Sequence, residues 1–391
     1  MQVDFTPEQH ALRQELRSYF DTLLTPDVRA GLSSMEGGEG YKTIVERMGR
    51  DGWLGVGWPK EYGGQGRTAV DQLIWFEEAR KSGAPFPFVT LNTVGPTLIA
   101  KGTEEQKQRF LPGILAGTTH FAIGYTEPDA GTDLASLKTS AVRDGDDYVV
   151  NGTKIFTSGA NQADYIWLAC RTNTEGRKHD GISILIVDTQ LPGFSWSPIE
   201  TVGGGFTTMS YYENVRVPAD MIVAGENQGW KLITLQLNHE RVGLAAFGCL
   251  GESLLEDVAD WARATEGPDG GCVADSPWVQ VALGEACARV EALKVLNWRM
   301  AWGIEQGNID AALASAVKVY GTETVIEIYR LLMDVLGVIG TLQAGSPGAV
   351  LQGRIEESWR GAQINTYGGG VNEVQRSLVA TLGLRMPRTG R

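Results

Sequence analysis

The feature that most constrains the fold of this chain is the change in hydrophobic spacing along its length. From residue 1 to about 119, apolar residues recur at the three- and four-residue spacing of helices. From about 121 to 223, β-branched and aromatic residues form short runs separated by Gly, Asn, Asp and Pro, which is the pattern of strands and turns. After residue 229 the helical spacing returns. This order predicts a helical region, a β region and a second helical region.

Local signals in the first region agree with this prediction. Thr6 followed by Pro7 is typical of a helix start, because a threonine hydroxyl caps the first turn and proline fits the first helical position. The segment Gly52–Gly66 is too rich in Gly and Pro for a helix and predicts a long loop. The segment Gly102–Gly117 predicts a helix that Pro112 interrupts.

The chain has 391 residues, more than one hydrophobic core usually supports. We therefore expect an α+β fold with an N-terminal α-helical domain at 1–119, a middle, antiparallel β-barrel-like domain at 120–228 and a C-terminal α-helical bundle at 229–391. Glycine-rich loops at 263–277 and 337–348 interrupt the bundle. Its long helices have apolar residues on several sides, which indicates further burial against other subunits.

Composition excludes several kinds of function. The formal charge of −13 argues against nucleic acid and anionic membranes as partners, because both require clustered Lys and Arg. The sequence has no leader-like start and no run approaching the roughly 20 apolar residues of a membrane span, so we expect a cytoplasmic protein. The four cysteines and four histidines are scattered without metal-ligand spacing, so no metal site is expected.

Two motifs in the β region carry chemical information. The first, AIGYTEPDAGTDL at 122–134, offers backbone N–H groups around Gly131 and the small hydroxyls of Thr126 and Thr132. Such groups suit an uncharged heterocycle rich in hydrogen-bonding atoms. The second motif, DDYVVNGTKIFTSGAN at 146–161, follows closely. Taken alone, the first motif is also compatible with an ordinary polar loop before a strand.

Together the two motifs resemble the flavin-binding core of the acyl-CoA dehydrogenases, and the helical, β, helical order extends the resemblance over essentially the whole chain. The resemblance implies FAD as cofactor and α,β-dehydrogenation of an acyl-CoA thioester to the trans-2-enoyl-CoA. It also implies which residues contact the flavin: Tyr125 and Thr126 at the pyrimidine edge, Thr132 toward the ribityl chain and the substrate, Phe156 stacked on the ring, and Thr157 and Ser158 near its reactive nitrogen.

The reaction needs a general base for the α proton. Many acyl-CoA dehydrogenases carry this base as a Glu in a C-terminal motif, but the matching segment here, TYGGGVNEVQR, has Gly369 at that position. In another branch of the family the Glu lies in an ERLVL-like segment, which resembles HERVGLAA of this chain. The resemblance makes Glu240 the expected catalytic base and Arg241 its neighbour in substrate binding. Alternatively, Glu240 is an ordinary surface residue paired with an arginine.

Two further residues of the C-terminal motif acquire roles from the resemblance. A backbone N–H near Gly369 would polarise the thioester carbonyl, so Gly369 is a substrate-binding residue. Glu373 matches a glutamine that contacts the flavin in the family, which favours cofactor binding or a helix cap over a role as base.

The segments with which family members grip a neighbour's FAD differ in this chain, because ATEGPDGGCVADSP and MDVLGVIG lack the family pattern. With GVGWPKEYGG and GGGVNEVQR, the chain resembles the catalytic-type subunit of actinobacterial heterotetrameric dehydrogenases that act on steroid side chains. The resemblance implies a second acyl-CoA dehydrogenase-like subunit in an α2β2 heterotetramer, an electron-transferring flavoprotein as acceptor, and a bulky or branched acyl group. The alternatives are a flavin monooxygenase or oxidase of the same fold, and a non-catalytic partner subunit.

Overall fold

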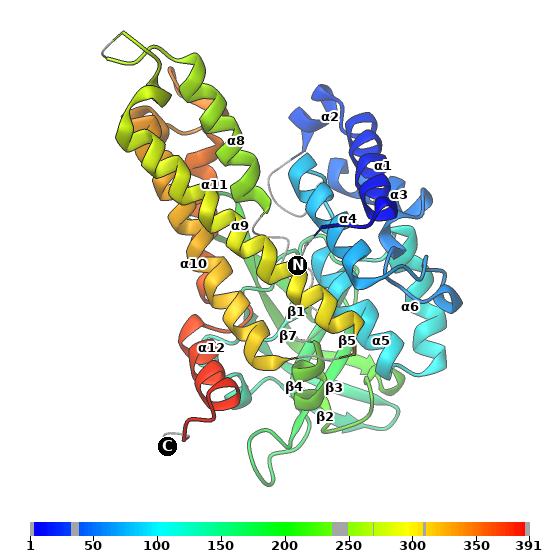
Figure 1. The fold of residues 1–391 in the computed structure, drawn as a ribbon. Coiled ribbons are helices and arrows are strands. Elements are labelled where there is room, and N and C mark those ends of the chain that lie inside the picture. The colour runs from blue at the N-terminus through cyan, green and yellow to red at the C-terminus, as the bar shows by residue number, and fades with distance from the viewer. Residues whose placement is uncertain (1–3, 33–38, 237–248, 269, 308–309, 388–391) are drawn as a thin grey trace.

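In the computed structural model, residues 4–32, 39–236, 249–268, 270–307 and 310–387 are described. The N-terminal region is helical, as predicted (Figure 1). Its helices are α1 (Pro7–Leu23), α2 (Pro26–Gly31), α3 (Glu39–Arg50), α4 (Ala69–Ser82), α5 (Gly95–Lys101) and α6 (Glu104–Ala116). The Thr6 side chain accepts from the Gln9 N–H at the start of α1, which confirms the predicted cap. Leu12, Leu16 and Phe20 on one face of α1 are buried.

The structure corrects the prediction that Pro112 interrupts its helix, because α6 runs continuously from Glu104 to Ala116. Pro112 removes the N–H that would bond to the carbonyl of Gln108. Both residues are exposed, so water can satisfy that carbonyl. The predicted loop at Gly52–Gly66 is confirmed as non-α, although it contains two short 3₁₀ turns.

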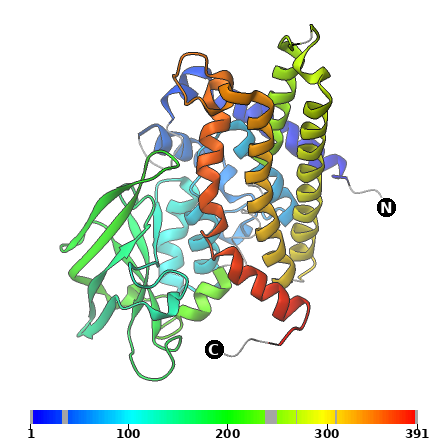
Figure 2. The same ribbon diagram turned by 90° about the vertical axis from the view of Figure 1, so that its left-hand side faces the viewer.

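The middle region folds into one seven-stranded sheet with the order β1-β4-β2-β3-β7-β6, and β5 pairs with β4. Its strands are β1 (Phe121–Gly124), β2 (Ser140–Asp144), β3 (Asp147–Ile155), β4 (Tyr165–Arg171), β5 (Ile182–Asp188), β6 (Phe194–Glu200) and β7 (Phe206–Pro218). Figure 2 shows the sheet beside the helical regions. The prediction of a wholly antiparallel β region is wrong in one respect, because β4 pairs in parallel with β1 and with the first residue of β2, Ser140.

The C-terminal region is a bundle of long helices, as predicted. Residues 229–236 are helical. The other helices are α8 (Cys249–Ala264), α9 (Pro277–Glu305), α10 (Ala311–Leu336), α11 (Arg354–Ala362) and α12 (Asn372–Leu378). α8 and α9 both contact α4 of the N-terminal region. The predicted boundaries of the three domains, at 119/120 and 228/229, stay a prediction.

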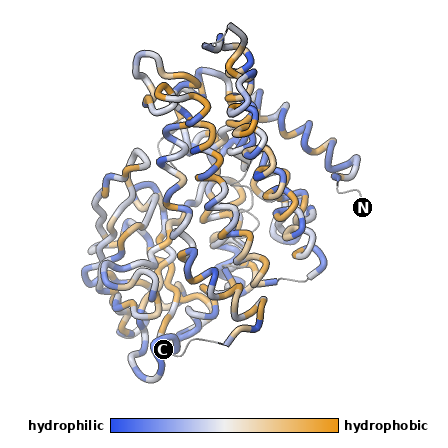
Figure 3. Tube along the Cα trace, turned by 60° about the vertical axis from the view of Figure 1, so that its left-hand side comes forward, coloured by the Kyte–Doolittle hydropathy of each residue, from blue (hydrophilic) through white to orange (hydrophobic). Residues whose placement is uncertain are grey.

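The hydrophobic core divides into two clusters. The larger one joins the N-terminal helices to the sheet and includes Trp75, Trp167 and the buried thiol of Cys170 on β4. The smaller one lies within the C-terminal bundle, around Ile328 and Leu332 of α10. In Figure 3 hydrophobic segments accordingly appear both in the sheet and along the bundle. Among the described residues, no helix is both long and apolar enough to cross a membrane.

Candidate active site

The two sequence motifs of the β region lie against each other. The backbone N–H of Ile155 donates to the carbonyl of Thr126 at 2.8 Å. The ammonium of Lys154 donates to the carbonyl of Tyr125 at 3.0 Å. The end of β3 is thereby joined to the loop that follows β1, so residues 125–127 and 154–158 lie side by side.

A buried ion pair holds this junction. Lys154 Nζ lies 2.8 Å from Glu127 Oε1, and the two side chains are 0% and 7% exposed. The Glu127 carboxylate also accepts the backbone N–H groups of Lys138 at 2.7 Å and Thr139 at 2.8 Å. Burial alone would raise the pKa of Glu127, but the Lys154 ammonium and these hydrogen bonds hold it below its ordinary value. Glu127 therefore stays ionised, and its turn is fixed by three charge-assisted hydrogen bonds.

Gly152 is the reason that Lys154 can reach Glu127. The pairing of β3 with β7 shifts register between Val150 and Gly152, which is a β-bulge. Gly152 has φ +153°, and a Cβ there would lie 2.7 Å from the backbone Cα of Thr139. Only glycine permits this close approach of β3 to the segment that donates to Glu127.

The structure separates Thr157 from Ser158, two neighbours that the sequence grouped together. The Thr157 side chain is fully buried, and its hydroxyl lies 3.0 Å from that of Ser210 on β7. Ser158 is exposed, with its hydroxyl 2.8 Å from that of Thr207. The hydroxyl of Ser158 is thus accessible to a ligand. The Thr157 hydroxyl is engaged inside the protein, and so is its backbone N–H, which donates to the carbonyl of Thr208 at 2.9 Å.

Phe156, just before them, has φ +60°, which is uncommon for an aromatic residue. Its side chain is 57% exposed beside the polar loop. Strained backbone of this kind is typical of functional sites. Thr132 is also exposed, and the backbone N–H groups of Gly131 and Thr132 have no hydrogen-bond partner within the described part of the chain.

Tyr125 belongs to a network that the sequence did not reveal. The indole N–H of Trp167 donates to the Tyr125 hydroxyl at 3.1 Å, and this hydroxyl donates to Gln236 Oε1. Because the indole can only donate, the direction of both hydrogen bonds and the orientation of the Gln236 amide are set. Gln236 is 1% exposed, and its Nε2 has no partner among the described residues. In the sequence, the only sign that Gln236 would be buried is its position between two leucines.

Gly369 and Glu373 lie in the C-terminal region, just before α12 and within it. Gly369 is exposed with φ +66°, and a Cβ added there would meet nothing within 4 Å. Gly370 follows with φ +97°. Glu373 is an exposed residue in the first turn of α12.

Lys318 on α10 holds this glycine loop. Its ammonium donates to the carbonyls of Thr366 at 3.1 Å and Gly370 at 2.8 Å, and to Asn372 Oδ1 at 2.7 Å. Burial lowers the pKa of Lys318 to about 8, against the opposing attraction of Glu323 and other acidic groups. The sequence prediction missed Lys318, because a lysine within a long helix carries no local signal of such a role.

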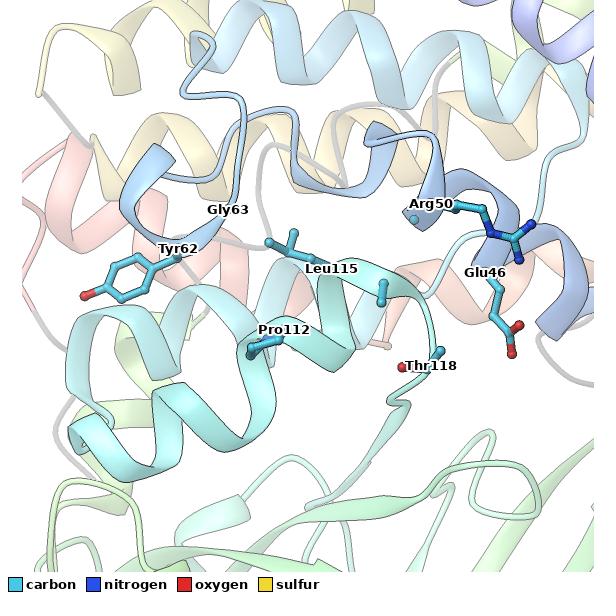
Figure 4. A pocket seen from close by; sticks show the side chains of 9 residues that line it. Glu46, Arg50, Tyr62, Gly63, Pro112, Leu115 and Thr118 are labelled. Atoms are coloured by element: carbon cyan, nitrogen blue, oxygen red, sulfur yellow. The ribbon is translucent and has the colours of Figure 1, made fainter.

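Three further observations delimit the site. Glu240 and Arg241 lie outside the described residues. Across the described ranges, no group of three or more His, Cys, Asp and Glu side chains could hold a metal ion. An open pocket lies on the N-terminal region between α3 and α6 (Figure 4). None of the cofactor-binding, substrate-binding or catalytic residues predicted from the sequence lines it. Its lining includes Glu46, Arg50, Tyr62, Pro112 and Leu115.

Comparison with known proteins gives one consistent result. Three family profiles match in order: "Acyl-CoA dehydrogenase, N-terminal domain" at residues 6–118, "Acyl-CoA dehydrogenase, middle domain" at 122–215 and "Acyl-CoA dehydrogenase, C-terminal domain" at 227–383. Acyl-CoA dehydrogenases FadE26 and FadE29 of Mycobacterium tuberculosis are 54% and 50% identical to the chain, and each match covers 100% of both chains.

Solved structures agree. A chain of "Tcur3481-Tcur3483 steroid ACAD" is 55% identical with a TM-score of 0.95, and a chain of the ChsE4-ChsE5 complex from Mycobacterium tuberculosis is 54% identical with the same TM-score. Both matches cover 100% of each chain. These matches confirm the resemblance and the fold inferred from the sequence, and the chain belongs to the acyl-CoA dehydrogenase family of flavin-dependent oxidoreductases.

Proposed function

We propose that this chain catalyses the FAD-dependent α,β-dehydrogenation of an acyl-CoA thioester to the trans-2-enoyl-CoA. The observation that carries the proposal is the junction of the two motifs, in which Thr126, Phe156 and Ser158 come together on one surface through the hydrogen bond between Ile155 and Thr126. Membership of the acyl-CoA dehydrogenase family supports it.

The residues present fit a flavin. The ring has hydrogen-bonding atoms along one edge and a flat apolar face, and the surface offers both kinds of partner. The N–H groups of Gly131 and Thr132 and the hydroxyl of Ser158 would serve the polar atoms, and the exposed Phe156 ring would stack on the face. Tyr125, Thr126 and Thr157 complete the proposed contacts of the β region, and Glu373 is the proposed contact from the C-terminal region. Bound FAD would accept the β hydrogen with its electron pair.

We assign the removal of the α proton to Glu240. In the proposed reaction Glu240 takes the α proton, while a backbone N–H near Gly369 polarises the thioester carbonyl and Thr132 and Arg241 contact the substrate. The support is indirect: Gly369 occupies the family's usual position for the base, and glycine has no group to remove a proton. The base must then come from elsewhere, and Glu240 matches the position used by the other branch of the family.

The test is Glu240→Gln in the complex with its partner chain. Mixing the wild type with a reactive acyl-CoA should bleach the flavin absorbance, and Glu240→Gln should keep the flavin but lose the bleaching. Glu256→Gln, at an exposed position on α8, is the control and should behave as the wild type. Full activity of Glu240→Gln would overturn the assignment.

We further propose that the functional unit is an α2β2 heterotetramer with a second acyl-CoA dehydrogenase-like chain. The two similar solved structures carry paired names, "Tcur3481-Tcur3483" and "ChsE4-ChsE5 complex". α9 also exposes large apolar side chains to solvent, which is typical of a helix that packs against another subunit. They are Trp278, Val281, Val295 and Trp302.

Purified alone, the chain should bind FAD poorly, and coexpression with the chain encoded beside it should restore flavin content. Stoichiometric flavin in a homotetramer of this chain would contradict the proposal. Trp302→Glu should weaken the heterotetramer, measured by its mass in solution. Val142→Glu, at an exposed site on the β2 strand, should leave assembly unchanged.

The acyl group is proposed to be bulky or branched, with steroid side chains as the leading candidates. The word "steroid" in the name of one similar structure supports this, as does the open space beside Gly369. A panel of straight, branched and steroid acyl-CoA thioesters, compared by the rate of flavin reduction, tests it. Faster reduction by short straight thioesters would refute the proposal.

We also propose an electron-transferring flavoprotein as acceptor and a cytoplasmic location. Reoxidation by such a flavoprotein with little oxygen consumption would support the dehydrogenase, whereas rapid oxygen consumption would favour an oxidase. Cell fractionation tests the location.

A further inference from the structure

We propose that Lys318 is a positioning residue for the reaction: it fixes the backbone of Gly368–Gly370 so that an N–H of this loop meets the thioester carbonyl. The inference rests on the proposed function, which assigns the carbonyl to an N–H near Gly369. It adds the residue that makes this N–H a fixed donor.

The loop has few internal restraints: the Gly368 N–H donates to the carbonyl of Ile364 at 2.8 Å, which leaves Gly369 and Gly370 to be fixed. Gly368, Gly369 and Gly370 are consecutive and have no side chains to pack. Glycine loses more backbone entropy on ordering than any other residue, so a triple glycine is costly to fix. Two of the three have positive φ, and the space around the Cβ position of Gly369 is empty to 4 Å. A donor that must meet a carbonyl to within a fraction of an ångström needs outside support.

Lys318 supplies support on both sides of the glycines. It binds the carbonyl of Thr366 before them and the carbonyl of Gly370 at their end. An ammonium has three donors, and the third goes to Asn372 Oδ1. The loop is therefore tied at both ends to a single atom on the long helix α10.

Asn372 locks the position of the ammonium in turn. Its Nδ2 donates to Glu323 Oε1 at 2.9 Å and to Thr322 Oγ1 at 3.1 Å, both on α10. Because lysine can only donate and a carboxylate can only accept, the amide has one possible orientation. Asn372 is 2% exposed, so water does not compete for these bonds.

The charges around Lys318 make its role dependent on pH. Glu323 on α10 and Glu373 on α12 face the ammonium, and Arg376 on α12 pairs with Glu323 at 2.7 Å. Half-burial outweighs the two carboxylates and lowers the pKa of Lys318 to about 8. Above that pH the neutral amine has one donor fewer, so one of the three ties is lost.

The experiment compares wild type, Lys318→Met and the matched control Lys294→Met in the flavin-loaded complex. Lys294 is also a partly buried lysine of the bundle, but it pairs with Glu252 and Glu291 on the surface of α8 and α9. The probe is the acyl-CoA of the panel that the wild type reduces fastest, labelled with ¹³C at the thioester carbonyl. Its infrared stretching frequency reports the hydrogen bond to the carbonyl, and stopped flow gives the rate of flavin reduction.

In Lys318→Met we expect the carbonyl frequency to move back toward its value in water and the reduction rate constant to fall about 10- to 100-fold, with little change in KM. The wild-type rate constant should decline above pH 8, and that step should be missing in Lys318→Met. Lys294→Met should match the wild type in carbonyl frequency, in reduction rate constant and in the decline above pH 8. An unchanged carbonyl frequency and rate in Lys318→Met would overturn the inference.

A second readout needs no turnover. Amide hydrogen exchange in residues 366–371 should be faster in Lys318→Met than in the wild type, and unchanged exchange would also overturn the inference. If the loop exchanges faster but the wild-type complex reduces no acyl-CoA, the proposed function fails while Lys318 is still shown to order the loop. The two failures are therefore distinguishable.

Discussion

The two sides of the candidate site are held in place in different ways. On the β side, Glu127 and Lys154 form a buried ion pair that ties the loop after β1 to the bulged strand β3. On the C-terminal side, a half-buried lysine ties a loop of glycines to a helix. The β side is locked by charges that water cannot reach, whereas the glycine side depends on one ammonium that water partly reaches. We infer that the proposed flavin surface is preformed and that the proposed substrate side is the adjustable one.

The largest expected effect comes from breaking the β side. Lys154→Met keeps an unbranched side chain, one atom shorter than lysine, but leaves the Glu127 carboxylate buried without its cation. Removing one partner of a buried pair costs about 3–5 kcal/mol, so the free energy of unfolding should fall by that amount in urea denaturation. Flavin content of the complex should fall with it.

Lys138→Met is the matched control. Its side chain is 78% exposed, and its ammonium makes a single weak ion pair, with Nζ 3.9 Å from Asp129 Oδ2. Its loss should therefore change the free energy of unfolding by no more than about 0.5 kcal/mol. Equal effects of the two substitutions would show that the β side is not locked by its ion pair.

A smaller effect is expected from stiffening the glycine side. Gly369→Ala meets no atom within 4 Å, but its φ of +66° is unfavourable for alanine. The left-handed conformation costs about 1–2 kcal/mol, which should appear as a loss in the free energy of unfolding. Gly361→Ala on α11 also meets no atom, has helical backbone, and should raise stability by about 0.5–1 kcal/mol. A stabilising Gly369→Ala would mean that the loop has a different backbone in solution.

The smallest effects are in the pH dependence of the free energy of unfolding, because Glu127 and Lys318 titrate in separate pH ranges. Glu127 has a folded pKa below its ordinary 4.5, so its stabilisation is complete above that value and is lost as the pH falls. Lys318 has a folded pKa of about 8 against 10.5, so the native state binds fewer protons between these values. The free energy of unfolding should therefore rise with pH across that window.

Denaturation across the pH range measures both slopes. Lys154→Met should flatten the acid slope. Because burial also lowers the pKa of Lys154, this variant should change the alkaline slope as well. Lys318→Met should flatten the alkaline slope alone, and a change of its acid slope would show that the two sides are coupled.

Much of the fold could be predicted from the sequence because local signals agreed with the tertiary structure. The cap at Thr6 and the spacing of Leu12 and Leu16 specify α1 without reference to the rest of the chain. Strand β6 is harder to predict because it is an edge strand that contains Pro198, a residue that weakens a strand prediction. The parallel pairing of β1 with β4 was missed because pairing partners are set by the whole sheet.

The site was predicted less completely. The motifs predict a flavin side, which stays a prediction, and the opposite environments of Thr157 and Ser158 depend on the backbone of Phe156. Lys154 and Thr157 are both buried although they are three residues apart, because the positive φ of Phe156 breaks the alternation of the strand. Lys318 was missed because its acceptors are 48 to 54 residues away in the sequence. The predicted roles of Glu240 and Arg241 stay predictions.

The buried thiol on β4 gives the protein an internal reporter of opening. Burial raises the pKa of Cys170 to about 12, so the reactive thiolate is absent at neutral pH while the sheet is intact. Cys287 on α9 is exposed and can be alkylated in the native chain. The slow alkylation of Cys170, resolved from that of the other three cysteines, would then time the transient separation of β4 from its neighbours. That time is how long the proposed flavin surface, built on the same sheet, survives between openings.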